Sequence, residues 1–226
     1  MLYACHHKKA LLFEPRAPEF LNAYTSNTLE RPGNAFVDVH GRIVATADQH
    51  VLSGGKVLMV IEARFEERLR RHLEKYAAFF GTRIGETAYR VYFDLDSSAR
   101  PAATDIVIPQ KAGRLILSPN DLPAPVAEEE FRLFRVQNGI PLQGVDYDQD
   151  ILLNVADEEY VSYEKGCYLG QEVIARIHFR GKPSKKLAVI SEAECSIADR
   201  DRLSSKTWDP RQGKFFGFLF LQNHEP

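Results

Sequence analysis

The spacing of hydrophobic residues along the chain predicts several helices. In residues 64–80 apolar positions recur every three or four residues, and the opposite flank carries Glu and Arg at i, i+4 spacing. Similar spacing predicts helices over residues 127–137 and about 169–179. A shorter helix is expected to open at Pro15 and to run through Tyr24, since Pro is tolerated in a first helical turn.

Short apolar runs between turn residues predict strands in the rest of the chain. The segment 96–110 is rich in Ser, Ala and Pro and is expected to be a linker. The order strands, helix, strands, helix, helix, strands predicts an α+β fold with antiparallel sheets and packed helices rather than alternating βαβ units. The expected strands are 9–13, 35–39, 43–47, 57–61, 89–95, 114–117, 161–163, 186–190 and 215–221.

Composition places the chain among ordinary globular proteins. It has 226 residues, of which 44% are hydrophobic and 27% charged, and this length fits one or two domains. The formal net charge of −2 argues against a nucleic-acid clamp that works by phosphate neutralisation. Three sparse cysteines form no disulfide framework, and no apolar stretch approaches the length of a membrane span. A soluble protein of a reducing compartment is therefore expected.

The segment 165–172 combines groups that could carry chemistry, since it reads Lys-Gly-Cys-Tyr-Leu-Gly-Gln-Glu. Cys167 is expected at the N-terminal end of the following helix, where the helix dipole and Lys165 would favour a thiolate. Free amides at that end could accept an anion, and Glu172 would share a helix face with Arg176. The alternative is an inert cysteine beside an ordinary surface ion pair.

This segment resembles the K-G-C-[FY]-x-G-Q-E signature of the YgfZ family. That family comprises folate-binding-fold relatives of the glycine-cleavage T-protein (aminomethyltransferase) and includes mitochondrial iron–sulfur assembly factors. The resemblance covers roughly residues 8 to 190. Weaker elements that occur in the family's order are residues 20–27, 41–43, 131–141 and 173–182.

The resemblance implies a T-protein-like folate-binding region over residues 1–184, with a division into subdomains of about 1–95 and 96–184. A partial C-terminal β-barrel over residues 185–226 would follow. It also implies a tetrahydrofolate pocket in the middle of the molecule and Cys167 as the reactive thiol. No metal site is expected. The implied folate-binding residues are Gln137, Lys165, Gly166, Tyr168, Gly170, Gln171, Glu172 and Arg176.

Two positions differ from the T-protein and bear on whether this chain shares its chemistry. Gln137 occupies the position of a T-protein Glu and could match the donor and acceptor edge of a pterin, although an exposed polar residue at a helix end is the plainer reading. The acid that aminomethyl transfer needs would fall at Ala45 or Thr46, and neither is a carboxylate. Asp48 lies two residues or more away, where a strand register error would turn it to the other face.

The resulting hypothesis is a monomeric folate-binding protein that supports assembly or repair of iron–sulfur proteins, including cluster enzymes that modify tRNA. It would act in a bacterial cytoplasm or in the mitochondrial matrix of a eukaryote, with no direct nucleic-acid or membrane partner. The first alternative is a tetrahydrofolate-dependent aminomethyl transferase, which the missing acid disfavours. The second is a ligand-free scaffold.

Two further features allow a functional and a plain interpretation. Residues 5–7 read Cys-His-His and offer soft and imidazole metal ligands, but three adjacent residues do not converge easily on one ion. A basic flank on the 64–80 helix could contact RNA or an acidic protein, but interleaved Glu residues favour a solvated face. That flank is formed by Arg64, Arg68, Arg71 and Lys75.

Overall fold

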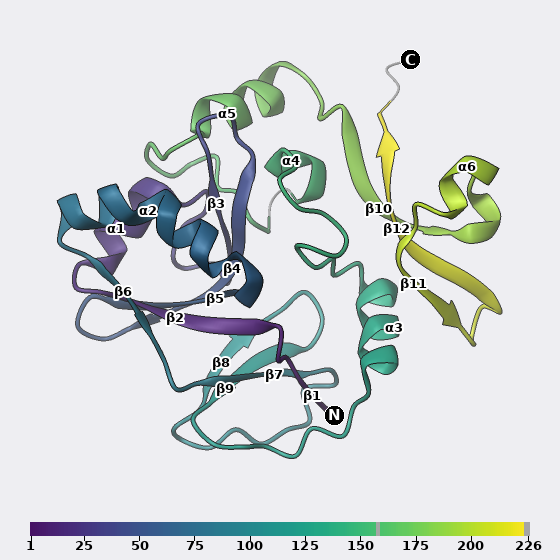
Figure 1. Cartoon of the computed structure of the whole chain (residues 1–226), viewed down its shortest axis with the longest axis horizontal. Helices are drawn as coiled ribbons and strands as arrows, with labels where there is room; N and C mark the ends of the chain where they lie inside the picture. The colour runs from purple at the N-terminus through teal and green to yellow at the C-terminus, as the bar shows by residue number, and fades with distance from the viewer. Residues whose placement is uncertain (157–158, 224–226) are drawn as a thin grey trace.

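Three antiparallel sheets form the framework of the protein (Figure 1). The computed structural model describes residues 1–156 and 159–223. The largest sheet has five strands in the order β3-β4-β5-β2-β6. Its strands are β2 (Lys8–Glu14), β3 (Gly33–Val37), β4 (Ile43–Leu52), β5 (Lys56–Glu62) and β6 (Arg83–Glu86).

Helices cover one face of this five-stranded sheet. They are α1 (Ala17–Tyr24), the short 3-10 helix η1 (Ala63–Phe65) and α2 (Glu66–Phe80). The apolar stripe of α2 packs on the sheet through Leu69 and Leu73, which are fully buried. This burial gives α2 its stability, because an isolated 15-residue helix is marginal in water.

The second sheet packs on the opposite face of the first. It has the order β1-β7-β9-β8, with β1 (Leu2–Ala4), β7 (Arg90–Asp94), β8 (Ile106–Pro109) and β9 (Arg114–Ser118). Its apolar face joins one core with Leu58 and Val60 of β5 and with Phe131 of α3 (Glu128–Asn138). The first sheet is thus buried on both faces, which explains the continuous apolar run of β5.

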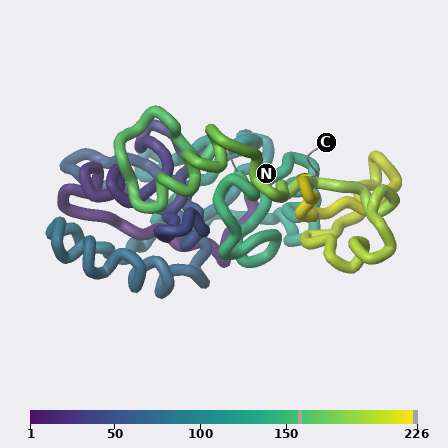
Figure 2. The backbone as a smooth tube through the Cα atoms, turned by 90° about the horizontal axis from the view of Figure 1, so that it is seen from above, coloured from purple at the N-terminus to yellow at the C-terminus, as the bar shows by residue number. Residues whose placement is uncertain are grey.

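The third sheet lies at one end of the elongated molecule (Figure 2). Its order is β10-β12-β11, with edges at β10 (Lys185–Ser191) and β11 (Ser204–Asp209) around β12 (Lys214–Gln222). A core cluster joins Leu187 and Phe218 of this sheet to the short helix α4 (Leu152–Val155) and to α5 (Gln171–Arg180). Two short helices, η2 (Glu192–Glu194) and α6 (Ile197–Arg200), complete this end.

A buried ion pair fastens the third sheet to the middle of the molecule. Arg135 of α3 lies 3.1 Å from the carboxylate of Asp146, and both side chains are almost fully buried. The other oxygen of Asp146 accepts hydrogen bonds from the hydroxyls of Ser204 and Ser205 on β11, at 2.7 and 2.6 Å. Arg135 itself donates to Ser205 at 2.9 Å. One charged network therefore sets the position of β11 against α3.

The α+β prediction is confirmed, with local corrections. Residues 106–109 of the expected linker form strand β8, because their apolar side chains complete the second sheet. Residues 161–163 form no strand, and α5 begins at Gln171 rather than near Leu169. β1 and β7 share a sheet with β8 and β9, so the second sheet crosses the expected boundary at residues 95 and 96.

Candidate functional site

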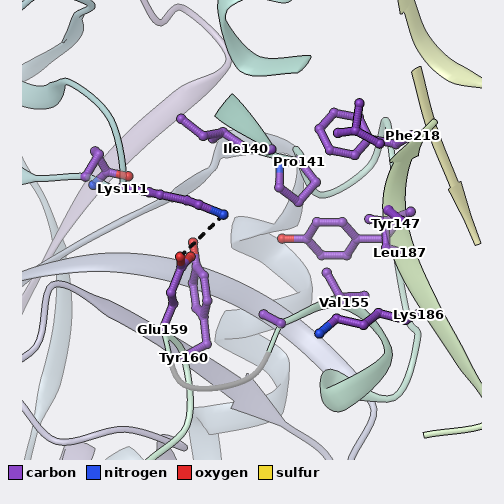
Figure 3. Close-up of a pocket in the computed structure, with 15 residues that line it drawn as sticks. Lys111, Ile140, Pro141, Tyr147, Val155, Glu159, Tyr160, Lys186, Leu187 and Phe218 are labelled. Atoms are coloured by element: carbon purple, nitrogen blue, oxygen red, sulfur yellow. Dashed lines mark ion pairs between the residues drawn. The ribbon is translucent and has the colours of Figure 1, made fainter. Parts of the chain in front are cut away.

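A cavity of about 300 Å³ lies between the third sheet and the middle of the molecule (Figure 3). Its aromatic and apolar wall brings together Tyr147, Tyr160, Pro141 and Phe218, while Lys111 and Glu159 approach from one side. Ligand pockets for small molecules are typically apolar with a few polar groups and begin at about this volume. The complete lining is Gln110, Lys111, Gly139, Ile140, Pro141, Tyr147, Val155, Ala156, Glu159, Tyr160, Lys186, Leu187, Ala188, Val189 and Phe218.

A second cavity of about 290 Å³ adjoins the first on the side of the five-stranded sheet. Four residues line both cavities, namely Gln110, Lys111, Glu159 and Tyr160. The second cavity adds Asp48 from β4, with Arg31 and Gly33 nearby. The pair of cavities, hereafter the central cleft, is lined by residues of all three sheets. No local sequence pattern predicts it.

Two tyrosines supply neutral hydroxyl groups to the central cleft. Burial raises the pKa of Tyr147 and of Tyr160 well above the ordinary value, so both phenols stay protonated at neutral pH. The hydroxyl of Tyr147 lies 2.8 Å from the hydroxyl of Thr46 on β4. Their rings offer flat surfaces on which an aromatic ligand could stack.

Asp48 is buried at the second cavity and is already partnered. Its oxygens accept from the amide of Gln110 at 3.0 Å and lie 3.4 Å from the ammonium of Lys8. Lys8 also contacts Glu62 at 3.1 Å. Burial lowers the pKa of Lys8, but the carboxylates of Glu62 and Asp48 outweigh this effect and raise it overall, so Lys8 stays charged.

The position of Asp48 bears on the acid expected at Ala45 or Thr46. Side chains alternate along a strand, so Asp48 faces the same side of β4 as Thr46, one strand repeat further on. Thr46 is hydrogen-bonded to Gln143 and to Tyr147, in the direction of the first cavity. A carboxylate is thus present on the face of β4 that carries Thr46, two residues further along the strand and paired with Lys8, whereas Ala45 faces the other side.

The segment 165–172 lies on a loop that is hydrogen-bonded to the C-terminal end of α1 and to the residues that follow it. The ammonium of Lys165 donates to the backbone carbonyls of Thr25 and Asn27 at 2.6 and 2.9 Å. The backbone amide of Leu169 donates to the carbonyl of Ala23 at 3.1 Å. The ammonium of Lys165 is therefore used to hold the loop.

Two other residues of the segment complete this anchor. The ring of Tyr168 is buried in the core with Ile174 of α5. Gly170 has φ +82°, and a Cβ at this position would overlap the carbonyl oxygen of Asp38. Gly166 has open space around it, and Cys167 between them is exposed. The loop thus presents one accessible thiol from an anchored backbone.

The remaining predicted residues near this loop lie on the surface. Gln171 opens α5 and is half-buried, whereas Glu172 and Arg176 are exposed. In the part of the chain that the structure describes, no ion pair joins Glu172 to Arg176. They line an open surface hollow together with Val173, Ala175, Phe179 and Arg180. Cys167 lies in the loop before α5, as expected, but α5 begins at Gln171, so the thiol is further from the helix N-terminus than predicted.

Gln137 lies in a different place from Cys167 and from the cleft lining. It is exposed on α3, and its amide donates to Asp209 of β11 at 3.0 Å. None of the residues predicted to bind folate is among those that line the two cavities. Their role in folate binding stays a prediction, while the cleft adds Lys111, Glu159, Tyr147 and Tyr160 as candidates that no sequence pattern marked.

The other sequence features receive structural roles. Cys5 is buried, and burial raises the pKa of its thiol. Among the described residues, no group of three His, Cys, Asp or Glu side chains could hold a metal ion. Arg64 and Arg68 of the basic flank donate to the backbone carbonyls of Gly144 and Val44.

We expect the stability of the protein to rise with pH through the environment of Lys165. Burial lowers the pKa of Lys165 to about 8, from 10.5 in an exposed chain. Between these values the unfolded state binds more protons than the folded state, so the free energy of unfolding increases with pH. Urea unfolding at pH 7.5 and 9.5 should show a steeper rise for the wild type than for Lys165→Met. Equal slopes in the two proteins would contradict this assignment.

Comparison with solved structures defines the fold. The crystal structure of glycine cleavage system aminomethyltransferase T from Bartonella henselae superposes with a TM-score of 0.75 at 15% sequence identity. The match covers 98% of this chain and 78% of that one. The chain therefore has the aminomethyltransferase T fold, which confirms the fold expected from the resemblance.

Sequence comparison adds relatives that match parts of the chain. Over 101 residues the chain is 32% identical to the Dictyostelium discoideum iron-sulfur cluster assembly factor IBA57 homolog, mitochondrial. Over 66 residues it is 35% identical to the protein of the same name from Mycosarcoma maydis. These matches cover 41% and 27% of this chain, but only 24% and 16% of the relatives. No family model matches the chain. None of its described helices has the length and apolar character needed to cross a membrane.

Proposed function

We propose that this protein binds a folate in the central cleft and supports assembly or repair of iron–sulfur proteins through the thiol of Cys167. The observation that carries this proposal is an exposed cysteine on an anchored loop, in a chain with the aminomethyltransferase T fold. The similarity to proteins named as iron–sulfur cluster assembly factors supports the same assignment. The iron–sulfur proteins that it supports would include cluster enzymes that modify tRNA.

The central cleft suits the chemistry of a folate. Such a ligand combines a flat heterocycle, a benzoyl ring and a carboxylate tail. The rings would pack among Tyr147, Tyr160, Pro141 and Phe218, which line the more enclosed first cavity. The protonated phenols would act as hydrogen-bond donors or acceptors to the heterocycle. The adjoining second cavity leaves space for the tail.

The thiol of Cys167 suits contact with iron or with a partner cysteine. A thiolate is a soft ligand that iron–sulfur clusters use, and its formation releases the thiol proton to solvent. Cys5 and Cys195 are buried, so a partner protein that approaches the folded chain meets Cys167 alone among the three. Because the loop is already ordered, binding would cost little further loss of conformational freedom.

We expect Cys167→Ala to abolish support of iron–sulfur enzymes. The variant should fold normally because the side chain is exposed. The measurement is the activity of cluster-containing enzymes in cells that lack their own copy of the protein and express each variant. Cys195→Ala is the matched control, since it removes a buried thiol elsewhere. Full activity with Cys167→Ala would exclude the thiol mechanism.

Folate binding is tested by titrating the purified protein with tetrahydrofolate while following its intrinsic fluorescence. Saturable binding that is lost in Tyr160→Ala would assign the ligand to the central cleft. Loss in Gln137→Ala alone would instead assign recognition to that amide, in agreement with the family resemblance. The absence of binding to the wild type would favour a ligand-free scaffold that works through Cys167 and its partners.

Aminomethyl transfer remains a second candidate because Asp48 is a buried carboxylate that lines the second cavity. Its pairing with Lys8 disfavours a role as a free base. Release of ammonia and methylenetetrahydrofolate from an aminomethyl donor, lost in Asp48→Asn, would establish this activity. We place the protein, as a monomer, in a bacterial cytoplasm or, for a eukaryotic source, in the mitochondrial matrix.

A further inference from the structure

The two cavities of the central cleft meet at an ion pair. Lys111 lies on the hairpin between β8 and β9, and Glu159 lies in the loop that follows α4. The ammonium and the carboxylate are 3.8 Å apart (Figure 3). Both side chains contribute to the lining of both cavities. Anything that extends from one cavity into the other passes this pair.

The ion pair between Lys111 and Glu159 is weak enough for another anion to replace Glu159. A separation of 3.8 Å is longer than a normal hydrogen bond, and the two side chains are 53% and 55% exposed. Exposed ion pairs of this kind contribute little to stability because water competes for both charges. The pair therefore does not serve to hold the cleft together.

The backbone of Glu159 is hydrogen-bonded to Asn27, so its side chain alone needs to move. The backbone carbonyl of Glu159 accepts a hydrogen bond from the side chain of Asn27 at 3.0 Å and lies close against Gly33. The ammonium of Lys111 lies near Gly139, the residue that ends α3. The negative end of a helix dipole favours a cation at that point.

Cationic and anionic side chains both face the central cleft. Lys111, Lys186 and Arg31 line it on the cationic side, and Asp48 and Glu159 on the anionic side. Asp48 is neutralised by Lys8 from behind, at 3.4 Å. Glu159 is thus the carboxylate that occupies Lys111 when no ligand is bound.

We propose that Lys111 binds the carboxylate tail of the ligand and that Glu159 is a built-in competitor which the tail displaces. This inference rests on the proposed function, because it takes the ligand to be a folate with its rings in the first cavity. The carboxylate of the tail then replaces that of Glu159 on the same ammonium, while Glu159 turns toward solvent. The cleft would therefore select ligands that carry an anionic tail.

If Glu159 competes with the ligand tail for Lys111, replacing Lys111 and replacing Glu159 should change the affinity for tetrahydrofolate in opposite directions. Lys111→Met should weaken tetrahydrofolate binding about tenfold, since one charged hydrogen bond is lost. Glu159→Gln should tighten it about threefold, because the competitor loses its charge while the side chain keeps its size. Binding of a tetrahydropterin that lacks the benzoylglutamate tail should change in neither variant. Lys182→Met, which removes an exposed lysine outside the cleft lining, is the matched charge control.

Isothermal titration of the four proteins with the two ligands separates the outcomes. If Lys111→Met and Glu159→Gln both weaken both ligands, the pair is structural and the competition is wrong. If the wild type binds both ligands equally well, and Lys111→Met also binds them equally well, Lys111 does not bind the tail. The proposal that the protein binds a folate would still stand. If the wild type binds neither ligand, the folate proposal fails, and this inference fails with it.

Discussion

Arg135→Met is expected to lower the free energy of unfolding by about 3–5 kcal/mol, because it leaves the buried carboxylate of Asp146 without its cation. A protein of this size has a total stability of only about 5–15 kcal/mol, so the variant should be marginal. Equilibrium urea unfolding monitored by circular dichroism measures the change. The hydroxyls of Ser204 and Ser205 would keep only part of the network.

Arg132→Met on the same helix is the control for this experiment. Arg132 is partly exposed and lies 3.9 Å from Glu128, a separation typical of a weak surface pair. Its replacement should change the free energy of unfolding by about 0.5 kcal/mol or less. A similar loss in both variants would mean that the Arg135 network does not fasten the third sheet as described.

The second large effect is expected from Gly170→Ala in the loop that carries Cys167. Alanine disfavours the left-handed backbone of Gly170 by about 1–2 kcal/mol, and its methyl group would overlap the backbone carbonyl of Asp38. We expect a total loss of about 3 kcal/mol, together with a displaced loop. Urea unfolding measures the first effect, and the rate of Cys167 modification by a thiol reagent measures the second.

Gly166→Ala is the control in the same loop. Among the described residues, no atom lies within 4 Å of the position that its methyl group would take, and its φ is outside the left-handed region. This variant should match the wild type in stability and in thiol reactivity. If Gly170→Ala also behaves like the wild type, the contact with Asp38 does not anchor the loop.

Much of the fold could be predicted because its signals are local. Residues close together in the sequence form the apolar stripe of α2 and the apolar patterns of the strands. The glycines that end α2 and α3 also directly follow the helices that they end. β8 was missed because its four residues follow a stretch rich in Ser, Ala and Pro, and only pairing with β9 makes them a strand. The short β1 was missed for the same reason, since β7 stabilises it from far along the chain.

The central cleft could not be predicted from the sequence, because its walls come from segments that are distant in the chain. Lys111, Glu159 and Phe218 meet only after three sheets have assembled, and none of them stands in a recognisable motif. Cys167 stays a prediction that rests on the motif formed by its neighbours, and the structure shows a structural role for two of these neighbours. Lys165 and Gly170 anchor the loop, a role that spacing alone does not reveal.

The course of the first strands has a consequence for how the chain folds. Residues 2–14 run through two sheets, with Tyr3 paired to Phe93 in one and Phe13 paired to Val57 in the other. Folding rates fall as contacting residues lie further apart in sequence, because long loops must close before such contacts form. The chain should therefore fold in milliseconds to seconds rather than in microseconds. Until these contacts form, β1 and β2 remain unpaired, and unpaired strand edges are prone to aggregation.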